Sequence, residues 1–125
     1  MKYVFIILLS LIWSAPSFAQ HSHGEKGPNG GPMEDVAGID AELVTSGTKV
    51  TINVFDPKNA KPIATKGYSA AVLIANGTAK ETVTLAASGE NSLQGEAKTE
   101  IAPGATVTLT IKTAEGKSGQ AKYKK

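Results

Sequence analysis

Only two histidines occur in this chain, His21 and His23, and the chain has no cysteine. Neutral imidazole is a good ligand for copper, zinc and nickel, and two imidazoles one residue apart can face the same ion when the backbone is extended. Met33 is the only methionine after the first residue, and a thioether favours soft Cu(I). We therefore take His21, His23 and Met33 as candidate metal ligands, with copper preferred to zinc or nickel.

This set is too small to close a metal site by itself, because a structural tetrahedral site normally has four ligands. The missing ligands could be the N-terminal amine, backbone amides, or the carboxylates of Glu34 and Asp35. The spacing is therefore typical of a loose capture site. The residues leave an alternative open: two solvated tail histidines that bind no particular ion, and a methionine that packs where the domain begins.

Residues 1–19 have the pattern of a secretory signal peptide, with Lys2, an apolar run over 4–13 and small residues at Ser17 and Ala19. The apolar run is too short to span a bilayer comfortably. We expect cleavage after Ala19, a periplasmic mature protein and no stable membrane anchor after cleavage. Without cysteine, the stability of the mature chain must come from its core.

The composition argues against an enzyme and against a nucleic-acid partner. No histidine lies beyond His23 to act as the base for a serine, and no glycine-rich phosphate loop joins a strand to a helix. The chain has 13 lysines against 11 acidic residues and no arginine, the side chain that best recognises phosphate and guanine. We expect a non-catalytic protein that binds no nucleic acid.

Glycine and proline are frequent in residues 20–35, which favours a flexible leader. From residue 36 onward apolar and polar residues alternate, which is typical of half-buried strands. Turn signals such as Asn76-Gly77 separate about seven short strands, near 39–45, 49–55, 67–75, 79–86, 92–98, 105–113 and 118–124.

This pattern predicts one all-β domain over 36–125, a small antiparallel immunoglobulin-like β-sandwich. If the apolar residues of the first strand face the core, Asp40 and Glu42 lie on its solvated face.

Four short segments follow one another in this chain: His-Gly at 23–24, Gly-Pro-Asn-Gly-Gly-Pro at 27–32, Val-Ala-Gly at 36–38 and Glu-Leu-Val at 42–44. Together they resemble small exported bacterial proteins with a His-rich leader and a Gly-Pro-X-Gly-Gly segment. Those proteins are similar to the N-terminal region of periplasmic adaptor subunits of heavy-metal, copper-type efflux systems. The resemblance implies a periplasmic β-sandwich with a role in metal handling. This chain departs from the more His-rich members, since it has no histidine in its strands.

The sequence therefore predicts a periplasmic metal-binding accessory protein. It would capture or hand over copper, or another heavy-metal ion, through His21 and His23. A heavy-metal efflux component or another envelope protein is the expected partner. The alternative hypothesis is a non-catalytic periplasmic protein-interaction module with no metal role.

Overall fold

The computed structural model describes residues 25–125, and this part of the chain consists of nine β-strands and their connections, without a helix. Neighbouring strands are antiparallel throughout. The strands are β1 (Glu25–Lys26), β2 (Pro32–Val36), β3 (Ile39–Ser46), β4 (Lys49–Phe55), β5 (Ser69–Asn76), β6 (Ala79–Ser88), β7 (Ser92–Glu96), β8 (Thr106–Lys112) and β9 (Ser118–Lys124).

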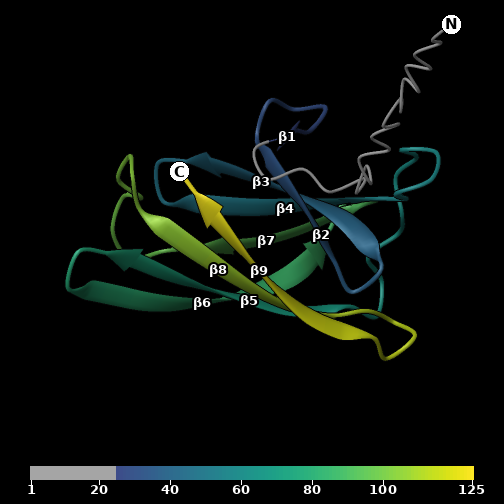
Figure 1. Cartoon of the computed structure of the whole chain (residues 1–125). Helices are drawn as coiled ribbons and strands as arrows, with labels where there is room; N and C mark the ends of the chain where they lie inside the picture. Colours follow the sequence, from purple (N-terminus) through teal and green to yellow (C-terminus); the bar gives the residue numbers. More distant parts are fainter. Residues whose placement is uncertain (1–24) are drawn as a thin grey trace, which may run out of the picture.

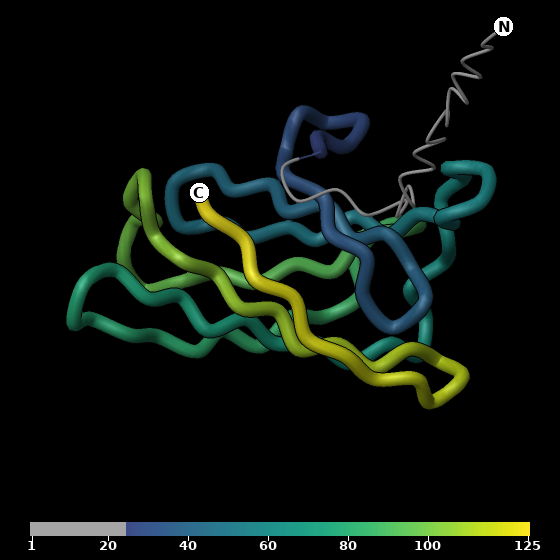
Figure 2. The backbone as a smooth tube through the Cα atoms, in the orientation of Figure 1, coloured from purple at the N-terminus to yellow at the C-terminus, as the bar shows by residue number. Residues whose placement is uncertain are grey.

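The nine strands form one continuous sheet in the order β1-β2-β3-β4-β7-β6-β5-β8-β9. Strand β6 joins the two halves of the sheet, because most of it pairs with β5 while its last three residues pair with β7. The sheet curls so that β2 comes back beside β9 (Figure 1), and Figure 2 lets the reader follow this path along the backbone. One half-sheet, β1–β4 with β7, therefore faces the other, β5, β6, β8 and β9, across the core.

The core is made of aliphatic side chains that alternate with wetter ones along each strand. In β8, Val107, Leu109 and Ile111 are buried and the intervening threonines are not. Val72 of β5 lies in register with Leu109 on one side and with Val83 on the other. Full burial of such a side chain stabilises the fold by about 1.5–3 kcal/mol. The same alternation decides which side chains remain on the two outer faces.

The all-β class predicted from the sequence is confirmed, and each of the seven predicted strands is present within a few residues of its expected bounds. The predicted two-sheet immunoglobulin-like sandwich with seven strands is not confirmed, because residues 25–125 make a single curled sheet of nine. The two further strands, β1 and β2, come from residues 25–36, most of which the sequence assigned to a leader.

The turn of the β5–β6 hairpin lies one residue later in the chain than the Asn76-Gly77 signal suggests. A loop at Asn76-Gly77 would have placed Glu81 opposite Val72 in the core. The observed two-residue loop is Gly77-Thr78, since Asn76 pairs with Ala79. Gly77 has a φ of 65°, as the first central position of a type II′ turn requires. Glu81 then lies opposite Ile74 near the sheet end and accepts the N–H of Lys98 at 2.7 Å.

Candidate functional site

The segment between β1 and β2 folds over the outer face of β3 and covers Glu42. Ala41 and Leu43 are buried in the core, so Glu42 points outward, yet its exposed fraction is 0%. Its Oε2 accepts the backbone N–H groups of Asn29 at 2.8 Å and Gly31 at 2.9 Å, and its Oε1 accepts the side-chain amide of Asn29 at 2.8 Å. Three donors satisfy a carboxylate that would otherwise be costly to bury. Glu42 therefore fastens the 27–31 loop to the sheet.

Two glycines of this loop are required by how closely it approaches β3. A Cβ on Gly27 would lie 2.5 Å from Cδ of Glu42, and one on Gly31 would overlap the carbonyl oxygen of Leu43. The loop is closed by hydrogen bonds from the Gly27 N–H to the Gly31 carbonyl at 2.7 Å and from the Gly30 N–H to the Gly27 carbonyl at 2.9 Å. The close approach of the loop to Glu42 and Leu43 thus explains locally why positions 27 and 31 are glycines.

Sequence reasoning missed this contact. It placed Glu42 on a solvated strand face, which is wrong because the 27–31 loop excludes water from it. A signal was present: a glycine-dense segment implies close backbone approach somewhere, and a nearby carboxylate is the natural acceptor for its N–H groups.

Met33 lies on the same outer surface, between two carboxylates. The register aligns Glu25, Met33, Glu42, Asn53 and Ser92 in one row across β1, β2, β3, β4 and β7. Directly opposed residues share a face, with Cβ atoms about 4.5–5.5 Å apart. Met33 is half-buried and Glu25 is exposed. Met33 therefore keeps partial access to solvent. On the far side of Glu42 the row continues to Asn53 and Ser92, where the Ser92 hydroxyl donates to Asn53 Oδ1 at 2.6 Å.

A second row on this surface brings two acids together. Asp35 of β2 lies directly opposite Asp40 of β3, and each is two residues from a member of the first row. The outer surface of β1, β2 and β3 is therefore acidic around the methionine. Carboxylates attract cations in general, whereas the thioether selects soft ones.

Tyr123 fixes the seam between β9 and β3. Its hydroxyl donates to the carbonyl of Ala41 at 2.9 Å, and its side chain is 3% exposed. Burial, together with the nearby carboxylates of Glu34 and Asp40, raises the pKa of Tyr123 above its ordinary value. The phenol is therefore neutral at physiological pH and serves as a structural donor.

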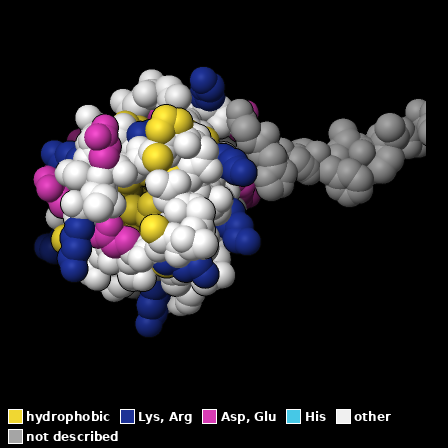
Figure 3. Space-filling model, turned by 90° about the vertical axis from the view of Figure 1, so that its left-hand side faces the viewer, with side chains coloured by type: hydrophobic (Ala, Val, Ile, Leu, Met, Phe, Trp, Pro, Cys, Tyr) yellow, Lys and Arg dark blue, Asp and Glu magenta, His cyan; other side chains and the backbone are white. Residues whose placement is uncertain are grey.

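An open hollow of about 330 Å³ lies at the end of the molecule beside the β5–β6 hairpin. Figure 3 looks onto this side, where hydrophobic side chains are visible between lysine and acidic ones. Ile74 and Ile101 line the hollow, along with Lys80, Glu81 and Glu100. Because both signs of charge line it, the hollow favours no particular class of charged ligand.

Of the three predicted metal ligands, only Met33 falls within the described residues; His21, His23 and the predicted signal peptide lie outside them. Within residues 25–125 no group of three or more His, Cys, Asp or Glu side chains is arranged to hold a metal ion. The described part of the candidate site is thus a single thioether on an acidic surface, next to the strand that the histidines precede in the sequence.

A search for membrane-spanning segments found, between residues 25 and 125, no helix of sufficient length and apolarity. Comparison of the chain with protein-family models, with curated proteins and with solved structures found no match.

Proposed function

We propose that this protein is an exported, non-catalytic metal-binding accessory protein of the periplasm. In this proposal His21 and His23 capture copper, Met33 adds a thioether ligand for Cu(I), and a heavy-metal efflux component or another envelope protein receives the ion. Zinc and nickel are the less favoured cargoes, because they gain nothing from a thioether.

The observation that carries the proposal is the pairing of β1 with β2. Glu25 lies directly opposite Met33, which places their Cα atoms about 4.5–5.5 Å apart. His23 is two residues before Glu25, so covalent geometry keeps its Cα within about 7 Å of the Cα of Glu25. The chain therefore allows the imidazole of His23 and the thioether of Met33 to reach one ion.

The hydrogen bonds of Glu42 support the same proposal, because they hold the loop after β1, the strand that the histidines precede in the sequence. The 27–31 loop joins β1 to β2 and is held by three hydrogen bonds to Glu42. Glu25 consequently keeps its place beside Met33. A fixed anchor on an acidic surface attracts cations, while an incomplete ligand set lets them leave again for a partner.

Titration of the purified exported protein with Cu(II), and competition titration with Cu(I), test the proposal. The His21→Ala/His23→Ala variant should bind both ions at least about tenfold more weakly. Met33→Leu, which conserves volume, should weaken Cu(I) binding and leave Cu(II) binding unchanged. Binding should also be lost as the pH falls through about 6.5, where free imidazole takes up a proton. Equal affinities of all three proteins would refute the proposal.

A second candidate function is a plain interaction module. The hydrogen-bonded order of the sheet ends at β1 and at β9; β2 lies beside β9, which leaves β1 as the outer strand. An outer strand of this kind can accept a strand from a partner. Deleting residues 20–24 removes both histidines, leaves β1 intact and so distinguishes the two proposed functions. If the protein is an interaction module that acts without its histidines, cross-linking in the periplasm should recover the same partner from the deletion variant. Loss of the partner would assign recognition to the deleted residues instead.

A further inference from the structure

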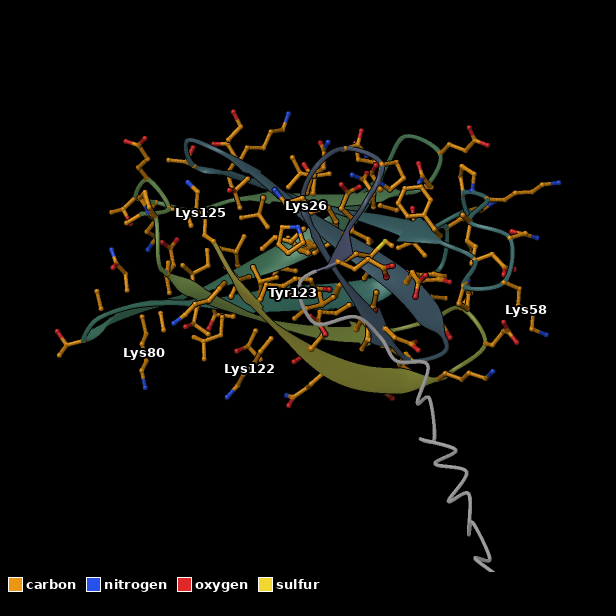
Figure 4. The ribbon with its side chains drawn as sticks, turned by 45° about the horizontal axis from the view of Figure 1, so that its top comes forward. Lys26, Lys58, Lys80, Lys122, Tyr123 and Lys125 are labelled. Carbon is orange, nitrogen blue, oxygen red and sulfur yellow. The ribbon has the colours of Figure 1, made fainter. Side chains whose placement is uncertain are left out.

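The outward side chains of β5, β6, β8 and β9 form one surface, which we call the lysine face. Strand alternation and register place four side chains from each strand on it. These sixteen positions include no Asp or Glu, and all but the lysines are Thr, Ser, Gln, Ala or Leu. Lys80 and Lys122 extend on the same side of the molecule in Figure 4. The lysines of this face are Lys80, Lys112, Lys122 and Lys124, and all four are exposed.

The other outer face has the opposite charge. Because the two half-sheets face each other across the core, their outer surfaces point in opposite directions (Figure 1). The outward positions of β1–β4 and β7 carry one lysine, Lys49, against five acidic residues: Glu25, Asp35, Asp40, Glu42 and Glu96. This difference makes the described part of the protein dipolar, although acids also lie at the margins of the lysine face, with Glu34 near Lys122 and Lys124 and with Glu81 near Lys80.

An apolar side chain lies in the middle of the lysine face. Leu73 is in register with Thr82 on one side and with Thr108 on the other, and Lys122 follows Thr108 in the same row. Leu73 is 38% exposed, and it is the one large hydrophobic side chain exposed in the part of the chain that the structure describes. The face thus has an apolar centre within a threonine surround and lysines at its margins.

The size of the face indicates what it can hold. Four strands about 4.8 Å apart, each rising about 3.3 Å per residue over seven residues, cover roughly 400 Å². A stable protein–protein interface buries about 800 Å² on each partner. That figure is accessible surface, which exceeds a flat projection, so the acidic face of a second copy is the competing occupant and would appear as a dimer in solution. An extended anionic surface has no such threshold, because its attraction sums over all the lysines.

We propose that the lysine face is a docking surface for an anionic lipid bilayer. Lys80, Lys112, Lys122 and Lys124 contact the headgroups, and Leu73 enters between them. The dipole sets the orientation as well as the attraction, since the acidic face is repelled from the same surface. Docked in this way, β1 and Met33 point away from the bilayer. The inference does not depend on metal binding.

Vesicle cosedimentation of the purified exported protein tests this directly. The probes are phosphatidylcholine vesicles with and without phosphatidylglycerol. Lys80→Gln/Lys122→Gln removes two charges from the face, while Lys58→Gln/Lys61→Gln removes two charges from the 56–62 loop and serves as the matched control. Each lysine near an anionic surface contributes about a fivefold factor in binding, so the face variant should bind about 30-fold more weakly. Binding should vanish near 1 M salt, where the Debye length is about 3 Å.

Three results would overturn the proposal. Equal losses in the two double variants would show that net charge alone matters. Equal binding to vesicles with and without phosphatidylglycerol would remove the role of the lysines. Binding to immobilised polyglutamate, with the same dependence on Lys80 and Lys122 but none to the anionic vesicles, would assign the face to an acidic protein. Circular dichroism establishes that each variant is folded, and Lys112→Gln/Lys124→Gln provides a second pair on the same face.

Discussion

Replacing Glu42 with alanine removes the acceptor of three hydrogen bonds at once. The backbone N–H groups of Asn29 and Gly31 then lose their partner, at about 1–3 kcal/mol for each donor left unsatisfied, and the bond from the Asn29 side chain is lost as well. The loop can limit this cost by lifting into water. We therefore expect Glu42→Ala to lower the free energy of unfolding by about 3–4 kcal/mol, a large share of the total of about 5–15 kcal/mol typical of such a domain.

Glu42→Gln separates the effect of the charge from the effect of the acceptor. Its Oε1 can keep both backbone N–H groups, and its amide can donate to Asn29 if the Asn29 side chain turns over to present its oxygen. All three bonds are then retained without the negative charge. Because charge-assisted bonds are roughly twice as strong as neutral ones, we expect a loss of about 1–2 kcal/mol.

Urea denaturation of the three proteins measures these differences, and amide hydrogen exchange at Asn29 and Gly31 shows whether the loop opens before the rest of the sheet. Glu96→Ala is the matched control. Glu96 is an exposed carboxylate at the end of β7, with a long contact of 3.5 Å from the Thr48 hydroxyl. It should change stability by less than about 0.5 kcal/mol. If Glu42→Ala costs no more than Glu96→Ala, the fastening role of Glu42 is refuted.

Three further substitutions probe the backbone and the contact between β9 and β3. Ala60 is exposed with a φ of 60°, a backbone conformation that favours glycine, so Ala60→Gly should stabilise the protein by about 0.5–1 kcal/mol. Gly47 has the same φ and no neighbour that a Cβ would contact, so Gly47→Ala should destabilise the protein by about 1 kcal/mol. Thermal unfolding of both variants measures these changes, and a melting temperature lowered by Ala60→Gly would contradict the prediction. Tyr123→Phe leaves the carbonyl of Ala41 without its donor and should cost about 1–2 kcal/mol in urea denaturation. Because the raised pKa of Tyr123 keeps its proton on in the folded state, the resulting stability is present below the ordinary pKa of 10.0 and is lost as the pH rises above it. The melting temperature of the Tyr123→Phe variant should therefore fall less steeply between about pH 9 and about pH 11, and parallel pH profiles would contradict this.

The strands of the core could be predicted because their alternation is a local property. Val107, Leu109 and Ile111 must share one face of a strand whatever the strand pairs with, and the turn glycines bound each element. How the halves join is not local. The last three residues of β6 pair with β7 instead of β5. This change of pairing partner makes one curled sheet, where a sandwich of two sheets was predicted. No periodicity in the sequence encodes that change of partner.

The first two strands were missed for a different reason. Gly-Pro-Asn-Gly-Gly satisfies every rule for a loop, and 27–31 is a loop, but the residues on either side of it still pair as β1 and β2. The loop between them is fastened to β3 by Glu42, and the glycine-dense segment signals a close approach without specifying that partner. A single carboxylate, buried on the outer face of β3, holds a segment of weak strand propensity against the sheet through three hydrogen bonds.

This ordering alters the physical basis of the metal hypothesis. If all of residues 20–35 were a free leader, the histidines would search a large volume and Met33 would move with them. With β1 anchored at Glu25, only the residues before it separate the histidines from the sheet, and Met33 stays fixed on an acidic surface beside that anchor. Shortening a tether raises the local concentration of its ends, and it does so without any added contact. The proposed ligands therefore gain a common location from Glu42, a residue that binds no metal in the proposal. The Gly-Pro-Asn-Gly-Gly segment has a structural role against Glu42 whether or not the protein binds copper.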